Sequence, residues 1–310
     1  MERIDYDEFA YFSQNAKEYG IKCELPPKVK RISTQVDSHR QVSSLIWGDT
    51  APEIVFLHGG AQNAHTWDSV ALALNRPLLT IDMPGHGHSD AGSHGSLSVK
   101  HLATDITKVI EALAPTAKSL VGMSLGGLTA LAALAQRSDL VQSLVLIDIT
   151  PGVNREKAAP ITSFISGPSR FSDFEKILAH TVEHNPTRSV ESLKRGILHN
   201  AIQLEDGSWV WRYARFRENE NIHDERPEFG DLWNAISNLD KPLMLVVGGS
   251  WSVVDEKDKA ELLRRKPDSR IEHVPGAGHS IQGDQPVALA RLLDDLLQEV
   301  SKSANRPSAY

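Results

Sequence analysis

The chain has 310 residues, 40% of them hydrophobic and 24% charged, which allows one large domain or two small ones with a sizeable core. Its net charge of −7 disfavours nucleic acid and anionic membrane as partners, because both require a basic face. The longest apolar runs, 144–147 and 243–247, have the length of strands and fall far short of the ~20 residues of a membrane-spanning helix.

The single cysteine, Cys23, cannot form a disulfide within the chain, and the acidic N-terminus has no apolar signal segment. Both features favour a cytoplasmic location, where thiols stay reduced.

Residues 1–30 form the first unit. Aromatic residues recur there at roughly helical spacing, Gly20 is a plausible stop, and Pro26 and Pro27 break the chain. We expect an N-terminal helical extension that packs on the main domain.

Strand and helix patterns then alternate over 31–150 and again over 231–303. Such alternation predicts an α/β fold with a mostly parallel sheet and helices on both faces. The predicted strands are 31–36, 42–47, 53–58, 78–82, 119–123, 143–148, 243–247 and 270–274, and the predicted helices are 99–113, 125–136, 256–265 and 286–300.

Residues 151–230 interrupt this alternation. Two helical patterns, 171–184 and 188–199, precede an aromatic run from Trp209 to Phe216. We expect a helical cap, or lid, inserted after the sixth strand and lying over the strand ends, where open α/β sheets bind ligands. The aromatic run either partly lines or supports the pocket, or it seals the cap onto the core.

Ser124 stands in the sequence Gly122-Met-Ser-Leu-Gly126-Gly127, between a predicted strand and a predicted helix. Small residues two before and two after the serine permit a sharp turn that lifts its hydroxyl clear of the backbone. The start of the helix also directs free N–H groups toward developing negative charge. This context predicts that Ser124 is a nucleophile.

His279 lies in a loop of small residues that follows the last predicted strand. Its place late in the chain, after the serine, suits a general base that comes within hydrogen-bond reach of Ser124. Three other histidines, His58, His86 and His88, are expected to form structural hydrogen bonds.

The motifs Leu57-His-Gly-Gly60, Asp82-Met-Pro-Gly-His-Gly-His-Ser89, Gly122–Gly127 and Gly278-His279 occur in one order along the chain. In this order they resemble the capped α/β-hydrolases over about residues 30–300. The resemblance implies an eight-stranded, mostly parallel sheet, a helical cap after the sixth strand and cofactor-free hydrolysis through an acyl-enzyme. It also implies that Gly60 and Leu125 donate backbone N–H groups to the oxyanion.

The family's usual acid follows the seventh strand, but Trp251 or Ser252 occupies that place here. Asp148, at the end of the sixth strand, is the favoured acid. Asp255 is the rival, although its position suits the N-cap of a helix. A site without an acid is the third possibility.

The sequence favours cleavage of a small or medium carboxylic ester, a small-molecule substrate. A lactonase or C–C bond hydrolase remains an alternative, although no arginine in the cap matches the one that holds a carboxylate in hydrolases of ring-cleavage products. A non-catalytic ligand-binding receptor on the same scaffold is the other alternative. The histidines show no metal-ligand spacing, so we expect neither a metal nor an organic cofactor.

Overall fold

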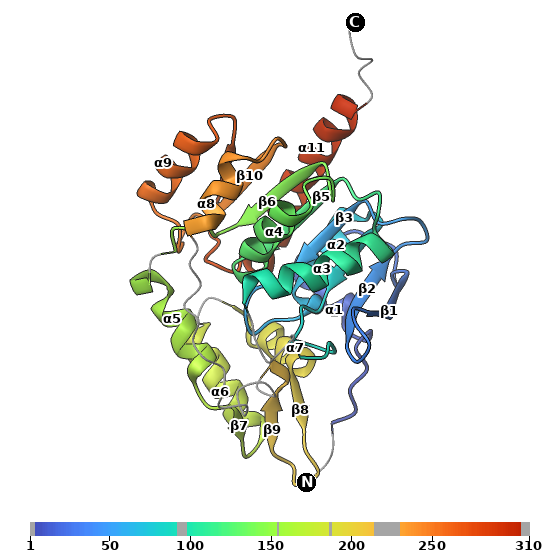
Figure 1. Ribbon diagram of the computed structural model, residues 1–310. Coiled ribbons are helices and arrows are strands. Elements are labelled where there is room, and N and C mark those ends of the chain that lie inside the picture. Colours follow the sequence, from blue (N-terminus) through green and yellow to red (C-terminus); the bar gives the residue numbers. More distant parts are fainter. Residues whose placement is uncertain (1–3, 92–97, 154, 186–187, 214–229, 305–310) are drawn as a thin grey trace, which may run out of the picture.

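The computed structural model describes residues 4–91, 98–153, 155–185, 188–213 and 230–304. Figure 1 shows two parts: a core built on a twisted sheet, and a smaller group of helices and short strands below it. The predicted α/β fold is confirmed.

The core sheet has eight strands in the order β1-β2-β4-β3-β5-β6-β10-β11 within the described residues. β2 runs antiparallel to both of its neighbours, and all other pairs are parallel, so the sheet is mostly parallel as predicted. The strands are β1 (Val29–Gln35), β2 (Gln41–Trp47), β3 (Ile54–Leu57), β4 (Leu78–Ile81), β5 (Ser119–Met123), β6 (Ser143–Ile147), β10 (Leu243–Gly248) and β11 (Arg270–Val274).

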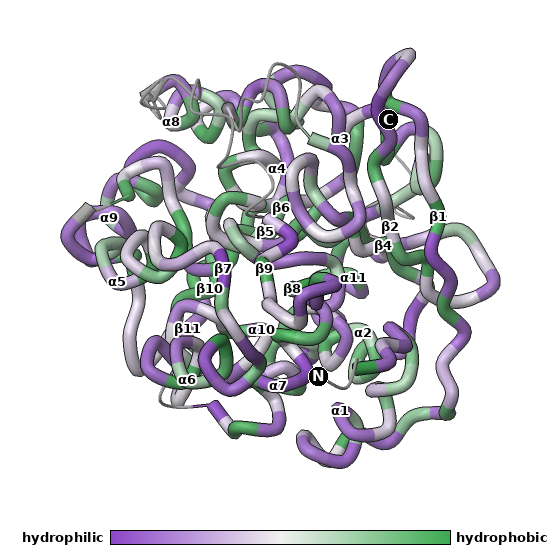
Figure 2. The backbone as a smooth tube through the Cα atoms, turned by 90° about the horizontal axis from the view of Figure 1, so that it is seen from below, coloured by the Kyte–Doolittle hydropathy of each residue, from purple (hydrophilic) through white to green (hydrophobic). Residues whose placement is uncertain are grey.

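Helices cover both faces of the sheet, and each face has its own apolar cluster. One face carries α3 (Val99–Leu113), α4 (Leu125–Gln136), α8 (Gly230–Ser237) and α9 (Glu256–Arg265). The other carries α1 (Phe12–Glu18), η1 (Ala64–Trp67), α2 (Asp68–Leu74), α10 (Ile281–Asp284) and α11 (Pro286–Ala304). In Figure 2, seen from below, β5 and β6 lie between α3 and α4 on one side and α2 and α10 on the other. None of the described helices is long and apolar enough to cross a bilayer.

The central strands are buried on both sides, as expected for parallel strands between two helical layers. Every residue of β3, β4, β5, β6 and β10 is buried. Because β3, β5, β6 and β10 are parallel neighbours, their carboxyl ends share one edge, and loops leaving that edge can place several side chains together.

The inserted segment between β6 and α8 contains both helices and strands. It consists of α5 (Arg155–Ser166), β7 (Arg170–Phe171), α6 (Phe174–His184), α7 (Val190–Asn200), β8 (Ala201–Gln203) and β9 (Trp209–Trp211). The three strands form an antiparallel sheet in the order β7-β9-β8, which our expectation of a purely helical cap did not include. Strands of two or three residues are too short to leave an alternating pattern in the sequence. The last part of the expected cap, residues 214–229, lies outside the described residues.

The helices α6 and α7 of the inserted segment each begin directly after a residue whose side chain caps the helix N-terminus. Asp173 accepts a hydrogen bond from the backbone of Lys176, and Ser189 accepts one from the backbone of Ser192. Side-chain capping of this kind satisfies an amide that has no partner within the helix. The two helices therefore start slightly later than the apolar spacing predicted.

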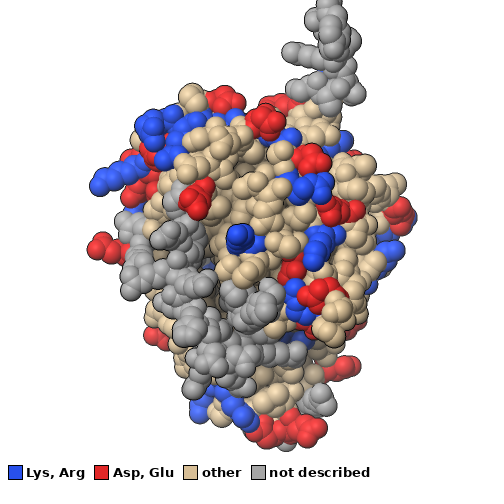
Figure 3. Space-filling model, in the orientation of Figure 1, with Lys and Arg blue, Asp and Glu red and all other residues tan. Residues whose placement is uncertain are grey.

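Positive and negative side chains are interspersed on the face drawn in Figure 3. Among the described residues of that face, no continuous basic surface forms. A nucleic-acid partner requires such a surface, so this face does not suit one.

Residues 4–20, the N-terminal strap, pack on the core through α1. Phe12 and Ala16 are buried, and the ring of Phe12 meets the ring of Trp47 edge-on at 5.1 Å between centroids. The helix is shorter than the aromatic spacing predicted, because the aromatic residues before Phe12 lie outside it.

The same strap also contacts the inserted segment. The Tyr6 hydroxyl lies 2.8 Å from Nδ1 of His199, near the end of α7. Farther along, Arg195 Nε donates to Asn15 Oδ1 at 2.8 Å. The strap therefore joins the cap to the core through polar contacts.

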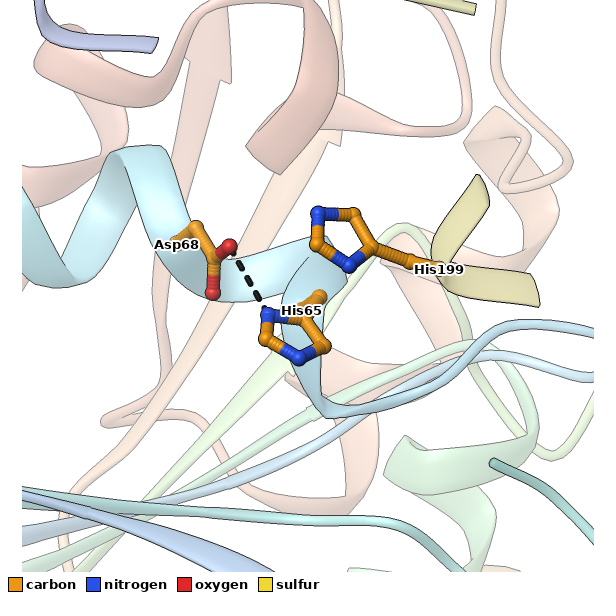
Figure 4. Close-up of side chains that lie close together, drawn as sticks. All are labelled: His65, Asp68 and His199. Atoms are coloured by element: carbon orange, nitrogen blue, oxygen red, sulfur yellow. Dashed lines mark hydrogen bonds and ion pairs between the residues drawn. The ribbon is translucent and has the colours of Figure 1, made fainter. Parts of the chain in front are cut away.

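A buried histidine pair stands at this junction (Figure 4). The rings of His65 and His199 stack at 4.0 Å between centroids. His65 Nδ1 contacts the Asp68 carboxylate at 2.9 Å, and His65 Nε2 contacts Glu8 at 3.0 Å. Burial alone would lower the pKa of His65, but the two carboxylates outweigh burial and raise this pKa to about 9. Burial, with the neighbouring positive charges, holds the pKa of His199 well below its usual range.

We predict that His65→Gln lowers the free energy of unfolding by about 1–3 kcal/mol, because buried carboxylates lose a charged partner. The folded pKa of His65 lies above its ordinary value of 6.5, so this stabilisation is complete below pH 6.5 and disappears as the pH rises through about 9. Urea unfolding at about pH 6 and about pH 10 measures the difference. His101→Gln, at an exposed histidine of α3, is the control. A stability difference that does not change with pH would contradict the charged state of His65.

Candidate active site

Ser124 lies on a strained turn between β5 and α4. Its φ of 52° is in the left-handed region, which is unusual for a residue other than glycine and costs about 1–3 kcal/mol. The serine is partly exposed, whereas the β5 residues before it are buried. The turn therefore presents the hydroxyl at the edge of the sheet, as the motif predicts.

Glycines make this turn possible by allowing backbone segments to approach closely. A Cβ on Gly122 would lie 2.4 Å from the carbonyl oxygen of Gly126, and a Cβ on Gly126 would lie 2.4 Å from the carbonyl oxygen of Leu57. Both distances are too short for any side chain. α4 can therefore start directly against β3 and β5 only with glycine at these positions.

Asp148 and His279 are hydrogen-bonded to each other. His279 Nδ1 donates to Asp148 Oδ2 at 2.8 Å, and the Asp148 side chain is fully buried. Asp148 follows β6 directly and has a φ of 49°, so its side chain leaves the sheet edge toward the histidine loop. Of the two candidate acids, this is the one whose carboxylate meets His279.

Three further donors hold the Asp148 carboxylate. The backbone N–H groups of Gly248 and Val253 donate to it at 3.0 and 3.1 Å, and the Ser252 hydroxyl also donates to it. Ser252 is one of the two residues that occupy the family's usual acid position. Ser252 therefore donates a hydrogen bond to an acid that lies at the end of β6, the strand next to β10.

Asp255, the rival acid, caps α9. Its side chain accepts from the backbone of Lys257 and Asp258, and the Asp258 side chain accepts from the backbone of Asp255 in return. These bonds form a capping box, which accounts for the carboxylate without catalysis. They also hold the pKa of Asp255 below its usual range.

The loop that carries His279 is held from both sides. The N–H of Gly278 donates to the Asp284 carboxylate at 2.8 Å, and the edge of the Trp251 ring packs against the imidazole. His279 is buried, and among the described residues its Nε2 has no hydrogen-bond partner. That nitrogen is therefore available to a group inside the cavity.

Gly60 and Leu125, the predicted oxyanion donors, line the same cavity as Ser124 and His279. Leu125 is the first residue of α4, so its N–H has no partner within the helix. Gly60 lies in the loop after β3, where a Cβ would lie 3.5 Å from the Ile165 side chain.

His58 supports this loop from beneath. Its Nδ1 donates to the carbonyl of Gly59 at 2.7 Å, and its Nε2 accepts from the N–H of Met83 at 2.9 Å. Burial lowers the pKa of His58 to about 3, so the ring stays neutral. This geometry suits the structural role predicted for His58.

The cavity has a volume of about 770 Å³, within the range of small-molecule sites. Its wall opposite the sheet is largely α5, through Ile161, Phe164 and Ile165. Trp209 and Trp211 instead belong to the apolar cluster inside the cap and do not line this cavity. Trp211 nevertheless supports the wall, because its ring meets that of Phe164 edge-on at 5.8 Å between centroids, and Phe216 lies outside the described residues. The helix α5, with Pro160 inside it, gives a weak helical pattern, so the sequence did not identify it as the wall itself.

Sequence reasoning also missed Arg188, which lies just before α7 and lines the cavity with Ser124. Its Nη2 donates to the Ser192 hydroxyl at 2.7 Å, and its buried Nε has no partner among the described residues. The expectation that no arginine of the cap matches the family's carboxylate-binding arginine stays a prediction, because lining the cavity does not by itself place Arg188 against a carboxylate. No local motif marks this residue, and only its place in the fold brings it to the cavity.

A second signal was also overlooked. His180, Glu183 and His184 of α6 form a cluster of possible metal ligands, although the sequence was expected to contain no such spacing. Two histidines four residues apart in a predicted helix lie on one face, which is the signal that could have identified them.

Comparison with known proteins places the chain in a family. The family model described as "alpha/beta hydrolase fold" matches residues 52–286. The chain is 40% identical to the esterase Rv0045c of Mycobacterium tuberculosis, covering 94% of this chain and 96% of that protein. A solved structure of that esterase, from work on its transition metal inhibition and structural refinement, covers 95% of this chain and 100% of the other with a TM-score of 0.83.

Two more distant relatives are each 28% identical. An sn-1-specific diacylglycerol lipase of Mus musculus matches 78% of this chain and 80% of its own length. A 2-(acetamidomethylene)succinate hydrolase of Mesorhizobium japonicum matches 82% of this chain and 91% of its own length. The chain belongs to the α/β-hydrolase fold family.

Proposed function

We propose that the protein is a serine hydrolase that cleaves a small or medium carboxylic ester through an acyl-enzyme. The observation that carries the proposal is one cavity lined by Ser124, on a strained turn, and by His279, whose Nδ1 is held by Asp148. A hydroxyl needs such a base to become nucleophilic.

In the first half-reaction, His279 Nε2 takes the proton of Ser124 as the Ser124 oxygen attacks the ester carbonyl. The C–O bond to the alcohol then breaks, and His279 returns the proton to the departing alcohol. In the second half-reaction, water gives its proton to His279 and attacks the acyl carbon, which releases the acid and restores Ser124. Asp148 fixes the tautomer of His279 and stabilises its charged form in both halves.

The oxyanion that forms at each attack needs donors aimed at it in advance. The N–H groups of Gly60 and Leu125 suit this role, because both residues line the cavity beside Ser124. The N-terminus of α4 adds a partial positive charge at the same place. Ser124, His279 and the two N–H donors account for the nucleophile, the base and the oxyanion donors. We therefore still predict that the reaction needs no cofactor.

The substrate class rests on two kinds of support. The esterase and the lipase among the relatives act on carboxylic esters by name, and the cavity wall formed by α5 is apolar. Arg188 favours a second candidate, a C–C bond hydrolase whose substrate carries a carboxylate, because its guanidinium lines the cavity. Turnover of such a substrate without any turnover of neutral 4-nitrophenyl esters would replace the first proposal by the second.

We predict that Ser124→Ala lowers kcat for 4-nitrophenyl butyrate by roughly two to four orders of magnitude, because triad members act as a unit. The change removes one partly exposed hydroxyl, so the melting temperature should stay close to that of the wild type. Covalent labelling by a fluorophosphonate probe should disappear as well. Hydrolysis near the wild-type rate, with contaminating esterase excluded, would overturn the assignment of the nucleophile.

We predict that Asp148→Asn lowers kcat by roughly two to four orders of magnitude, because the amide cannot stabilise the imidazolium of His279. Asp255→Asn is the matched control, since this carboxylate caps α9. Its effect should be a loss of stability of about 1 kcal/mol with little change in kcat. Both variants are to be compared at matched stability. A large loss of kcat in Asp255→Asn alone would identify Asp255 as the acid.

We predict that Ile161→Ala and Ile165→Ala shift the preference toward longer acyl chains by about tenfold, because each widens the apolar wall of the cavity. The ratio of kcat/KM for 4-nitrophenyl octanoate and acetate measures this preference. Leu263→Ala, at an exposed leucine of α9, is the control. Reactivity toward the fluorophosphonate probe should change less than the chain-length ratio. An unchanged ratio in both variants would show that α5 does not select the acyl group.

A further inference from the structure

A second cavity lies at the junction of the N-terminal strap, the cap and the core, where α7 contacts α1 (Figure 1). Its volume is about 170 Å³, and most of its lining side chains are polar. Gln62, Arg188 and Ser280 line both this cavity and the cavity that contains Ser124. Among the described residues of its lining, only Gly196 of α7 is exposed to solvent. This polar chamber therefore extends from the surface at Gly196 to the catalytic cavity.

The orientation of the Gln282 amide in the polar chamber is fixed by its neighbours. Gln62 Oε1 accepts a hydrogen bond from the N–H of Gly59 at 3.1 Å, so the Gln282 atom that lies 3.4 Å from this oxygen is the donor, Nε2. The same Nε2 lies 3.4 Å from Thr66 Oγ1. Gln282 is fully buried, and its Oε1 has no partner among the described residues, although buried polar atoms normally have one. A donor inside the polar chamber would satisfy this oxygen.

Three further side chains of the polar chamber have a buried nitrogen without a partner among the described residues. These atoms are Arg188 Nε, His199 Nε2 and Trp211 Nε1. The arginine and tryptophan nitrogens can only donate, whereas Gln282 Oε1 can only accept. Water both donates and accepts, and one molecule takes up about 30 Å³, so the chamber has room for several. A carboxylate would suit the two donors but would repel Gln282 Oε1.

The inner end of the polar chamber lies beside the general base. Ser280 directly follows His279, and its hydroxyl lies 3.5 Å from Gln62 Nε2. In the second half-reaction, His279 Nε2 must take a proton from water. The α5 wall of the catalytic cavity is apolar there and offers no hydrogen bond that could hold a water in place. A water beside His279 therefore finds its hydrogen-bond partners on the side of the polar chamber.

We propose that the polar chamber holds a chain of ordered waters and supplies the water that hydrolyses the acyl-enzyme. The water at the Gln62 end gives a proton to His279 Nε2 as its oxygen attacks the acyl carbon. The bond from that carbon to the Ser124 oxygen then breaks, and His279 returns the proton to Ser124. The next water of the chain takes the vacated place, and solvent refills the chain at Gly196. The role in deacylation rests on the proposed ester hydrolysis, whereas the presence of the waters does not.

The presence of the waters is tested without any activity measurement. Crystal structures of the wild type and of Gln282→Met are compared at a resolution that shows ordered water. We expect waters within hydrogen-bond distance of Gln282 Oε1 and Arg188 Nε in the wild type. Methionine is close to glutamine in size but has no amide, so the variant should lose the water bound to residue 282. A chamber without ordered water in the wild type would overturn the proposal, whether or not the protein hydrolyses esters.

Deacylation is tested by stopped-flow kinetics with 4-nitrophenyl butyrate. The burst of 4-nitrophenol reports acylation, and the decay of the acyl-enzyme, followed by rapid quench and mass spectrometry, reports deacylation. We expect Gln282→Met to slow deacylation about tenfold and to leave acylation and fluorophosphonate labelling within about twofold of the wild type, because only the second half-reaction consumes water. Gln142→Met, at an exposed glutamine, is the control. Equal slowing of both steps would overturn the proposal, because the base and the oxyanion donors serve both.

A second variant, Gly196→Leu, keeps the proposal falsifiable if Gln282→Met does not fold. A Cβ at Gly196 would meet no atom within 4 Å, and leucine suits a helix better than glycine, so this variant should fold. The leucine side chain narrows the opening of the chamber, so deacylation should slow at least about threefold. Gly196→Ala, which adds only a methyl group, is the matched control. Unchanged deacylation in both Gln282→Met and Gly196→Leu would overturn the water route.

A final comparison separates water from a polar part of the substrate. Glycerol monobutyrate and butyl butyrate form the same butyryl-enzyme, and kcat/KM reports the acylation in which they differ. We expect Gln282→Met to change the ratio of their kcat/KM values by less than about twofold. A loss confined to glycerol monobutyrate would assign the chamber to the hydroxyl groups of the alcohol and overturn the proposal.

Failure of the proposed function would have a different signature. Wild-type protein that hydrolyses none of these esters would overturn the ester hydrolysis and with it the role of the chamber in deacylation. The waters seen in the crystal structures would stand, because their presence does not depend on turnover.

Discussion

The candidate active site depends on the close approach of three backbone segments at the start of α4. Gly122 and Gly126 allow α4 to begin directly on the ends of β3 and β5, and the turn between them forces Ser124 into a left-handed conformation. The strain is retained because the packed strands on both sides leave the turn no alternative path. As a result, the hydroxyl and the free amides of the first helical turn face the same space. Any larger residue at either glycine would separate the nucleophile from its oxyanion donors.

The position of the acid follows from the geometry of the neighbouring strands. β6 and β10 are parallel neighbours, with Ile147 beside Val246, so residues just beyond either strand end can reach the same histidine loop. An acid can therefore move from one strand to the other if the new carboxylate is solvated by protein dipoles. Two backbone amides and the hydroxyl of Ser252 provide this around Asp148. The serine at the usual acid position is thus part of the arrangement and not a sign that the acid is lost.

The parts of the molecule that sequence predicted well are those in which local pattern and tertiary packing agree. The helices α3, α4 and α9 and the strand β5 have the predicted bounds, because each has a regular apolar face or a fully buried run. The strands of the cap, the contacts of Arg188 and the polar contacts of the N-terminal strap leave no periodic signal. They depend on which segments meet after folding, and a single sequence does not record that. Asp148 could be proposed as the acid because the strand order of this fold is known. The role of α5 as a wall of the cavity could not be predicted in the same way.

The cap has its own apolar cluster, and the strap attaches it to the core mainly through polar groups. The contact between Tyr6 and His199 holds the end of α7, while α5 and α6 form part of the cavity wall above Ser124. Chemistry and substrate range are therefore governed by different contacts. The sheet edge fixes the nucleophile, base and acid, which tolerate little change. The cap is held by the polar contacts of the strap and also by apolar contacts, since Ile161 of α5 packs against the core cluster and Ala61 of the core belongs to the cluster of the cap. Substitutions in these contacts can therefore change the cavity wall above Ser124 while the catalytic residues at the sheet edge keep their geometry.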